Sequence, residues 1–178
     1  MNWLFPLKQC PGIPLNFHPG AFGFPRKKGM SRHTGVDLYS TEGDPVLAVE
    51  DGVVVSVEAF TGPQDNSPWW LDTDAVLVEG KSGVICYGEV IPDVEVGQAV
   101  RRGQEIAQVS TVILEGRERP DIPGHSRSML HIELCDRGTK AASRGWKQGR
   151  AELGLCDPTP YLLASEGCPD TFLMWDAV

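Results

Sequence analysis

The sequence predicts an all-β protein made of short antiparallel strands with little helix, and three observations support this. The 178 residues include 20 glycines and 14 prolines, which favour frequent turns. The apolar runs are short, and several alternate apolar with polar residues, as half-buried strands do. Turn signals such as Asp51-Gly52 and Gly80-Lys81-Ser82-Gly83 separate these runs. Along the whole chain the pattern predicts about eight to ten strands.

The first half of the chain begins with an irregular segment and continues into strands. Residues 1–30 are interrupted by prolines, and we expect an N-terminal arm that packs on the rest of the domain through its aromatic side chains. Residues 31–39 are expected to form one strand. Two further strands, at residues 46–49 and 53–57, flank Asp51-Gly52, which is a strong hairpin signal.

The second half continues the pattern and sets the expected domain limits. Strands are expected at residues 75–79, 84–91 and 129–134, and a long charged loop at residues 115–128. The segment from Asp157 to Leu163 is expected to form a capped turn or short helix. We therefore expect one β domain over residues 31–164, preceded by the arm and followed by a C-terminal extension over residues 165–178.

Composition excludes several classes of partner and location. A formal charge of -8 argues against a nucleic-acid partner. No run approaches the roughly 18 apolar residues of a membrane span. No secretory signal is visible at the N-terminus, so we expect synthesis in the cytoplasm. The cysteines are odd in number and lack C-x-x-C spacing, so we expect free thiols at Cys10, Cys86, Cys135, Cys156 and Cys168.

The segment around His33 and Asp37 is the first half of a candidate metal site. On a strand, residues i and i+4 share a face, so these two side chains are expected to point into the same space. An imidazole and a carboxylate together suit zinc. The alternative is a surface histidine and aspartate on an ordinary strand.

A third donor comes about a hundred residues later. In the expected strand at residues 129–134, Leu130, Ile132 and Leu134 form one face, which should be core, and His131 lies on the other face. His33, Asp37 and His131 together provide two imidazoles and one carboxylate. Such a set leaves the fourth tetrahedral position open for water, as in catalytic zinc sites.

Five segments follow one another in an order that resembles a known family. They are the H-x-x-x-D motif at residues 33–37, the segments at residues 45–54 and 96–106, the strand around His131, and Asp157-Pro158-Thr159-Pro160-Tyr161-Leu162. In this order and spacing they resemble the LytM/lysostaphin-type zinc metallopeptidases of family M23, which cut peptide cross-links in bacterial cell walls. The resemblance implies an antiparallel sheet or sandwich of the LytM type, with a duplicated hybrid motif, whose groove binds zinc through His33, Asp37 and His131.

The chain departs from the family at two catalytic positions. Met129 stands where the first histidine of the family's H-x-H motif is expected, and Glu89 follows Tyr87-Gly88 where another active-site histidine is expected. Strict alternation places Glu89 on the strand face of Ile85, Tyr87 and Ile91, where a partly buried carboxylate has a raised pKa and can act as a general base. The alternatives for Glu89 are a fourth ligand or a charge lining the groove. His125, in the loop before Met129, is a further candidate, with a solvated loop histidine as the alternative.

The sequence therefore leaves two main functions open. The first is a zinc-dependent hydrolase of peptidoglycan cross-link peptides, or of a related peptide, with Glu89 as base. The second is a catalytically inactive, zinc-containing binding or structural module with the same groove. Because the wall lies outside the cytoplasm, we expect a phage or prophage origin, with the protein associated with a virion or released to the cell wall.

A lipoyl- or biotinyl-carrier-like domain is a third reading, suggested by Asp51-Gly52 and the repeated Gly-Gln steps. Such a domain needs a modified lysine flanked by methionine at a hairpin tip, and Lys81 lacks that flank. This reading also leaves the candidate metal ligands unexplained.

Overall fold

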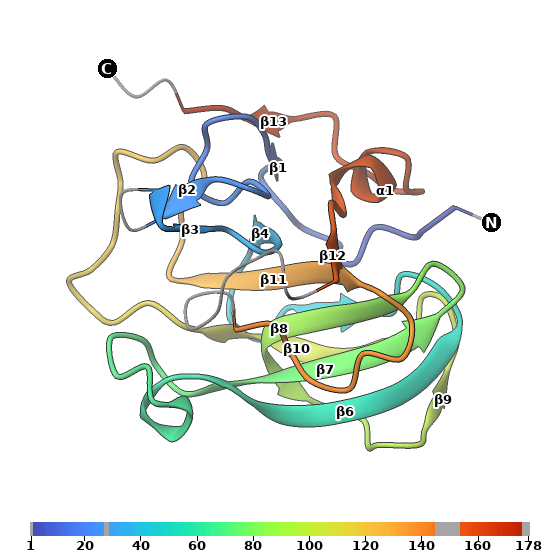
Figure 1. The fold of residues 1–178 in the computed structure, drawn as a ribbon. Helices are drawn as coiled ribbons and strands as arrows, with labels where there is room; N and C mark the ends of the chain where they lie inside the picture. Colours follow the sequence, from blue (N-terminus) through green and yellow to red (C-terminus); the bar gives the residue numbers. More distant parts are fainter. Residues whose placement is uncertain (1, 27–28, 145–153, 176–178) are drawn as a thin grey trace.

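The computed structural model describes residues 2–26, 29–144 and 154–175, and strands dominate it. A nine-stranded sheet forms the body of the molecule (Figure 1). Its strands are β4 (Val36–Tyr39), β5 (Pro45–Leu47), β6 (Gly52–Thr61), β7 (Thr73–Gly80), β8 (Val84–Pro92), β9 (Ala99–Val100), β10 (Glu105–Thr111), β11 (Ser128–Cys135) and β12 (Leu155–Cys156). Every pairing within this sheet is antiparallel, which confirms the predicted fold class.

Smaller elements complete the described part of the chain. The strand β1 (Ile13–Pro14) pairs with β13 (Phe172–Leu173), and β2 (Pro25–Arg26) pairs with β3 (Ser31–Arg32). The helical elements are α1 (Thr159–Leu163) and the 3-10 turn η2 (Pro63–Asp65). Within the described residues, no helix combines the length and the apolar character needed to cross a membrane.

Strand β11 has the most partner strands in the described sheet, and it brings distant segments together. It pairs with β4, β8, β10 and β12, so segments from both halves of the chain meet on it. In Figure 1, β6 and β7 lie on one side of β8 and β11, while the N-terminal and C-terminal segments lie together on the other side. The site described below lies where the N-terminal segment meets β11.

Alternation along β11 separates a core face from a face that carries polar groups. Leu130, Ile132 and Leu134 are at most 2% exposed and belong to the main core cluster, as the sequence predicts. The N-terminal segment contributes Trp3 and Phe5 to the same cluster. The opposite face is also buried, and it carries Met129, His131 and Glu133.

The hairpin predicted around Asp51-Gly52 is wrong. Strand β5 pairs with β10, whereas β6 pairs with β7 and β9. The acidic residues of this corner bind other segments: Glu50 accepts hydrogen bonds from Ser82, and Asp51 accepts one from the backbone of Arg102. These long-range bonds hold the turn between β5 and β6 so that β6 does not pair with β5.

The single strand predicted for residues 31–39 is also wrong. The chain forms β3 and then β4, and His33 lies between them, so His33 and Asp37 do not share one strand face. The break is at Gly35, where the backbone crosses β11 closely. A Cβ atom at Gly35 would lie 2.3 Å from the carbonyl oxygen of Ile132, so only glycine fits there.

Candidate functional site

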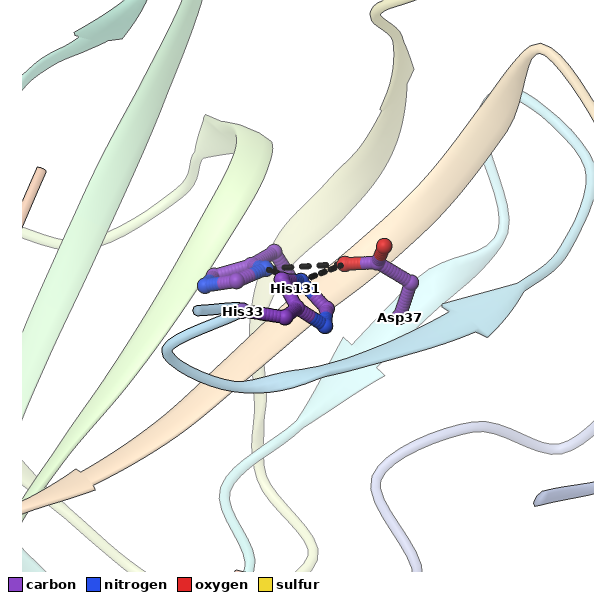
Figure 2. A group of neighbouring side chains, drawn as sticks. All are labelled: His33, Asp37 and His131. Atoms are coloured by element: carbon purple, nitrogen blue, oxygen red, sulfur yellow. Dashed lines mark hydrogen bonds and ion pairs between the residues drawn. The ribbon is translucent and has the colours of Figure 1, made fainter. Parts of the chain in front are cut away.

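Three buried side chains converge where β4, β11 and the segment between β3 and β4 meet (Figure 2). Oδ1 of Asp37 lies 3.1 Å from Nε2 of His33 and 2.8 Å from Nδ1 of His131. The two imidazole nitrogens are 3.3 Å apart. Among the described residues, these three form a group whose ligand atoms all lie close enough to hold one metal ion.

Strand pairing sets most of this geometry. In the antiparallel ladder of β4 and β11, Asp37 lies directly opposite His131, and side chains at opposite positions share a face. His33 is held by the N-terminal segment, where its backbone N–H donates to Phe24 and its carbonyl accepts from Gly23. The bend at Gly35 then brings the His33 ring over β11.

Each histidine has a second partner on the nitrogen that faces away from the group. Nδ1 of His33 lies 3.0 Å from the carbonyl oxygen of Ala21, and Nε2 of His131 lies 3.0 Å from Oε1 of Glu133. Both partners are acceptors, so these ring nitrogens carry the hydrogens when the rings are neutral. The lone pairs then point at one another and at Asp37, which is the arrangement that a metal ion requires.

Glu133 was missed by the sequence reasoning, although a signal was present. It is fully buried, it lies two residues after His131 on the same strand face, and it accepts a 2.5 Å hydrogen bond from the hydroxyl of Ser143. Burial raises its pKa, but the hydrogen bond and charge of His131 outweigh burial and lower it. Glu133 is therefore a carboxylate that orients His131.

The buried charges of the site affect one another strongly. Burial tends to raise the pKa of Asp37, but the two histidines outweigh burial and hold this pKa far below its usual range. Burial lowers the pKa of His33. Burial also acts to lower the pKa of His131, but hydrogen bonds to Asp37 and Glu133 raise it to about 10. Without a metal, His131 therefore carries a proton between two carboxylates.

Glu89 reaches this site through a bulge, which corrects its predicted position. Gly88 pairs with Ala75 and Val90 with Asp74, so Glu89 is left unpaired in the β7–β8 ladder and has a φ of 65°. The bulge turns the side chain away from the core face of Ile85 and Tyr87 into the cavity at His131. Its Oε2 is buried without a hydrogen-bond partner among the described residues, and burial raises its pKa to about 8.

The site opens into a cavity of about 490 Å³. Met129 lies on its wall, and so does His125, which is half-buried and has its ring centroid 5.3 Å from that of Tyr39. Trp69 and Trp70 also line the cavity. The wall also carries three arginines that the sequence did not indicate, Arg26, Arg32 and Arg119. Nη2 of Arg26 is 3.8 Å from Oδ2 of Asp37.

The three donor atoms have a spacing close to that required by a tetrahedral metal ion. Zinc bonds of about 2.0–2.2 Å at tetrahedral angles place ligand atoms about 3.4 Å apart. The observed separations of 2.8–3.3 Å are slightly shorter, so a small outward movement would admit the ion. Two imidazoles and one carboxylate are a donor set that zinc accepts. The residues therefore fit a divalent metal.

The fold of this chain is similar to the folds of several solved structures, including those of peptidases. The chain aligns with the catalytic domain of lysostaphin from Staphylococcus simulans at 18% identity and a TM-score of 0.53, covering 84% of this chain and 91% of that one. It aligns with LytU at 16% identity and a TM-score of 0.57, covering 83% and 85%. A zinc-containing peptidase from Vibrio cholerae aligns at 24% identity and a TM-score of 0.51, covering 75% of this chain and 36% of that one. These likenesses show a shared fold.

The sequence comparisons address family membership directly. A search of curated proteins gives no significant match. The model of peptidase family M23 matches residues 31–142, which include β4, β11 and all three donors of the candidate metal group. Because this match covers more than half of the chain, the protein belongs to peptidase family M23.

Proposed function

We propose that the protein is a zinc-dependent metallopeptidase that hydrolyses cross-link peptides of peptidoglycan or a related peptide. The observation that carries the proposal is the convergence of His33, Asp37 and His131 in a cavity, with Nε2 of His33 and Nδ1 of His131 both close to Oδ1 of Asp37. Within the proposal, these three residues hold the metal. Zinc supplies a Lewis acid that polarises a carbonyl group and lowers the pKa of water to about 7.

Glu89 is proposed as the general base. Its carboxylate faces the cavity, its Oε2 lacks a partner among the described residues, and its raised pKa suits proton transfer near neutral pH. As the water oxygen bonds to the carbonyl carbon, Glu89 takes a proton from that water. Glu89 then gives the proton to the leaving nitrogen as the C–N bond breaks. Met129 is the other position at which this chain differs from the family motif, and its side chain has no group that can transfer a proton.

The substrate class rests on the cavity and on the family. Trp69 and Trp70 provide an aromatic wall beside the metal group, with ring centroids 5.7 Å apart and Trp69 50% exposed. Aromatic walls of this kind suit the backbone and small side chains of an extended peptide. A cell-wall cross-link peptide has these properties, and lysostaphin, a structural neighbour, is described as an antimicrobial peptidase.

The test combines metal analysis with digestion of purified cell-wall peptides. We expect one zinc per chain, and cleavage products visible by mass spectrometry. Glu89→Gln keeps the shape and removes the basicity, so it should retain zinc and lose roughly 10² to 10⁴-fold in rate. Glu95→Gln is the matched control, since Glu95 is exposed and lies outside the cavity lining. If Glu89→Gln cleaves as fast as the wild type, the base is elsewhere, and His125 is next to test.

One observation favours a second candidate function. Neither Met129 nor Glu89 is a histidine, so the same groove would also suit a zinc-containing binding module that does not cut. A wild-type protein that holds zinc and binds wall peptides without cleaving them would establish this second function instead.

A further inference from the structure

Peptide hydrolysis places a negative charge on the carbonyl oxygen. At two positions where the family motif has histidines, this chain has Met129 and Glu89 instead. Met129 is apolar and Glu89 is acidic, so neither can stabilise that charge. A fixed cation beside the metal group would fill this gap, because hydrogen-bond donors aimed at developing charge are a large part of catalysis.

Three arginines line the cavity, and their contacts distinguish them. Arg119 is bound by both carboxylate oxygens of Asp121, at 2.9 and 2.7 Å, so its charge is already compensated. Arg32 is exposed and donates to the carbonyl oxygen of Gly23. Arg26, in contrast, approaches the metal group itself, since its Nη2 lies 3.8 Å from Oδ2 of Asp37.

Arg26 is also held in place before any ligand binds. Its Nη2 donates a 2.9 Å hydrogen bond to the carbonyl oxygen of Pro19, and its guanidinium carbon lies 5.7 Å from the centre of the Phe24 ring. At 3.8 Å the contact with Asp37 is too long for a hydrogen bond. A guanidinium has five N–H donors, so most of them remain for a ligand in the cavity.

The charge of Arg26 also acts on two other residues of the site. Burial is the main influence on the pKa of Glu89 and raises it, while Arg26 acts in the opposite direction. Burial likewise dominates the lowered pKa of His33, and Arg26 adds to that lowering. Arg26 therefore interacts electrostatically with both the proposed base and a proposed metal ligand.

We propose that Arg26 is a catalytic residue, which donates a hydrogen bond to the carbonyl oxygen of the scissile peptide as that oxygen becomes negatively charged. This inference rests on the proposed peptidase function. When the water oxygen bonds to the carbonyl carbon, the π electrons of the carbonyl become the negative charge on its oxygen, and the water proton passes to Glu89. When the C–N bond breaks, these electrons restore the carbonyl, and the proton passes from Glu89 to the nitrogen.

The first test is kinetic and uses the zinc-loaded full chain. Arg26→Met should lower kcat by roughly 10² to 10³-fold, the usual cost of removing one oxyanion donor, and leave KM within about threefold. Arg26→Lys keeps the charge and loses the planar fork, so it should recover part of the rate. The matched control is Arg101→Met, because Arg101 is exposed and lies outside the cavity lining. If the wild type cleaves and Arg26→Met cleaves equally well, the inference is wrong and the proposed function stands.

The second test measures binding and does not depend on turnover. The probes are an alanyl-alanine phosphinate pseudopeptide, whose tetrahedral anion imitates the intermediate, and the neutral ketomethylene analogue of the same length. Arg26→Met should weaken the phosphinate at least tenfold and change the neutral analogue and zinc by less than about twofold. This result supports the inference even if the wild type cleaves no peptide, in which case only the proposed function fails.

Three results of the binding test would overturn the inference. In the first, the zinc-loaded wild type does not bind the phosphinate. In the second, Arg26→Met weakens the phosphinate and the neutral analogue equally, so Arg26 only shapes the cavity. In the third, Arg26→Met weakens zinc as much as the phosphinate, so Arg26 positions Asp37 and does not contact the substrate.

Discussion

Replacing Glu133 with leucine should weaken zinc binding without disturbing the three proposed ligands. Glu133 is fully buried, and its Oε1 lies 3.0 Å from Nε2 of His131. The carboxylate fixes the ring orientation and keeps the hydrogen on Nε2, which leaves Nδ1 for the metal. Loss of such a partner typically costs 10 to 100-fold in metal affinity, which is about 1.4 to 2.7 kcal/mol.

The loss should depend on pH in a direction set by the pKa of His131. That pKa is raised to about 10 in the metal-free protein, so zinc must displace a proton at neutral pH and binds more tightly as pH rises. Glu133→Leu removes a carboxylate that raises this pKa, so proton competition weakens and offsets part of the loss at low pH. We therefore expect a greater loss of zinc affinity at pH 9 than at pH 7.

The assay is competition against a chromogenic zinc chelator at both pH values. Glu133→Gln keeps an oxygen acceptor for His131, so it should lose less affinity than Glu133→Leu. Glu50→Leu is the matched control, because Glu50 also accepts a serine hydroxyl, from Ser82 at 2.5 Å, and lies outside the cavity lining. Wild-type affinity in Glu133→Leu at both pH values, or an equal loss in Glu50→Leu, would refute the positioning role.

Four further predictions concern the metal, the base, the close approach at Gly35 and the thiols. His131→Ala should abolish zinc binding, measured by elemental analysis, and keep most of the β-sheet circular dichroism signal, because the core face of β11 is made by other residues. In the wild type, kcat/KM should fall as pH falls through the pKa of Glu89. This pKa lies at or below about 8, because a bound cation favours the carboxylate. Glu89→Gln should not show this fall in kcat/KM at low pH. Gly35→Ala places a Cβ 2.3 Å from the carbonyl oxygen of Ile132 and 2.9 Å from Nε2 of His131. It should therefore destabilise the fold by about 1–3 kcal/mol in denaturant titrations and weaken zinc binding. An unchanged denaturation midpoint would contradict this account. Thiol titration of the unfolded protein without reductant should find all five cysteines free, with Cys86 and Cys135 unreactive in the native state because burial raises their pKa values; two missing thiols would show a disulfide.

Local patterns in the sequence were sufficient for the all-β class and for the orientation of β11. Alternation with a period of two is a property of a single strand, so Leu130 and Ile132 could be assigned to the core without knowing any partner strand. The same alternation also indicated His131 on the opposite face. The H-x-x-x-D motif at residues 33–37 identified two of the three proposed ligands as neighbours, although not by the strand geometry first expected.

Only the tertiary structure decided how these pieces meet. Asp37 and His131 are 94 residues apart, and their alignment depends on the register of β4 on β11, which no local pattern encodes. Glu89 reaches the cavity because a bulge breaks the alternation that the sequence prediction assumed. Arg26 approaches Asp37 because the N-terminal segment packs over β11, where Pro19 and Phe24 hold its guanidinium. The sequence therefore determined which residues are suited to the chemistry, whereas long-range pairing, the bulge and the packing of the N-terminal segment determined which of them face one another.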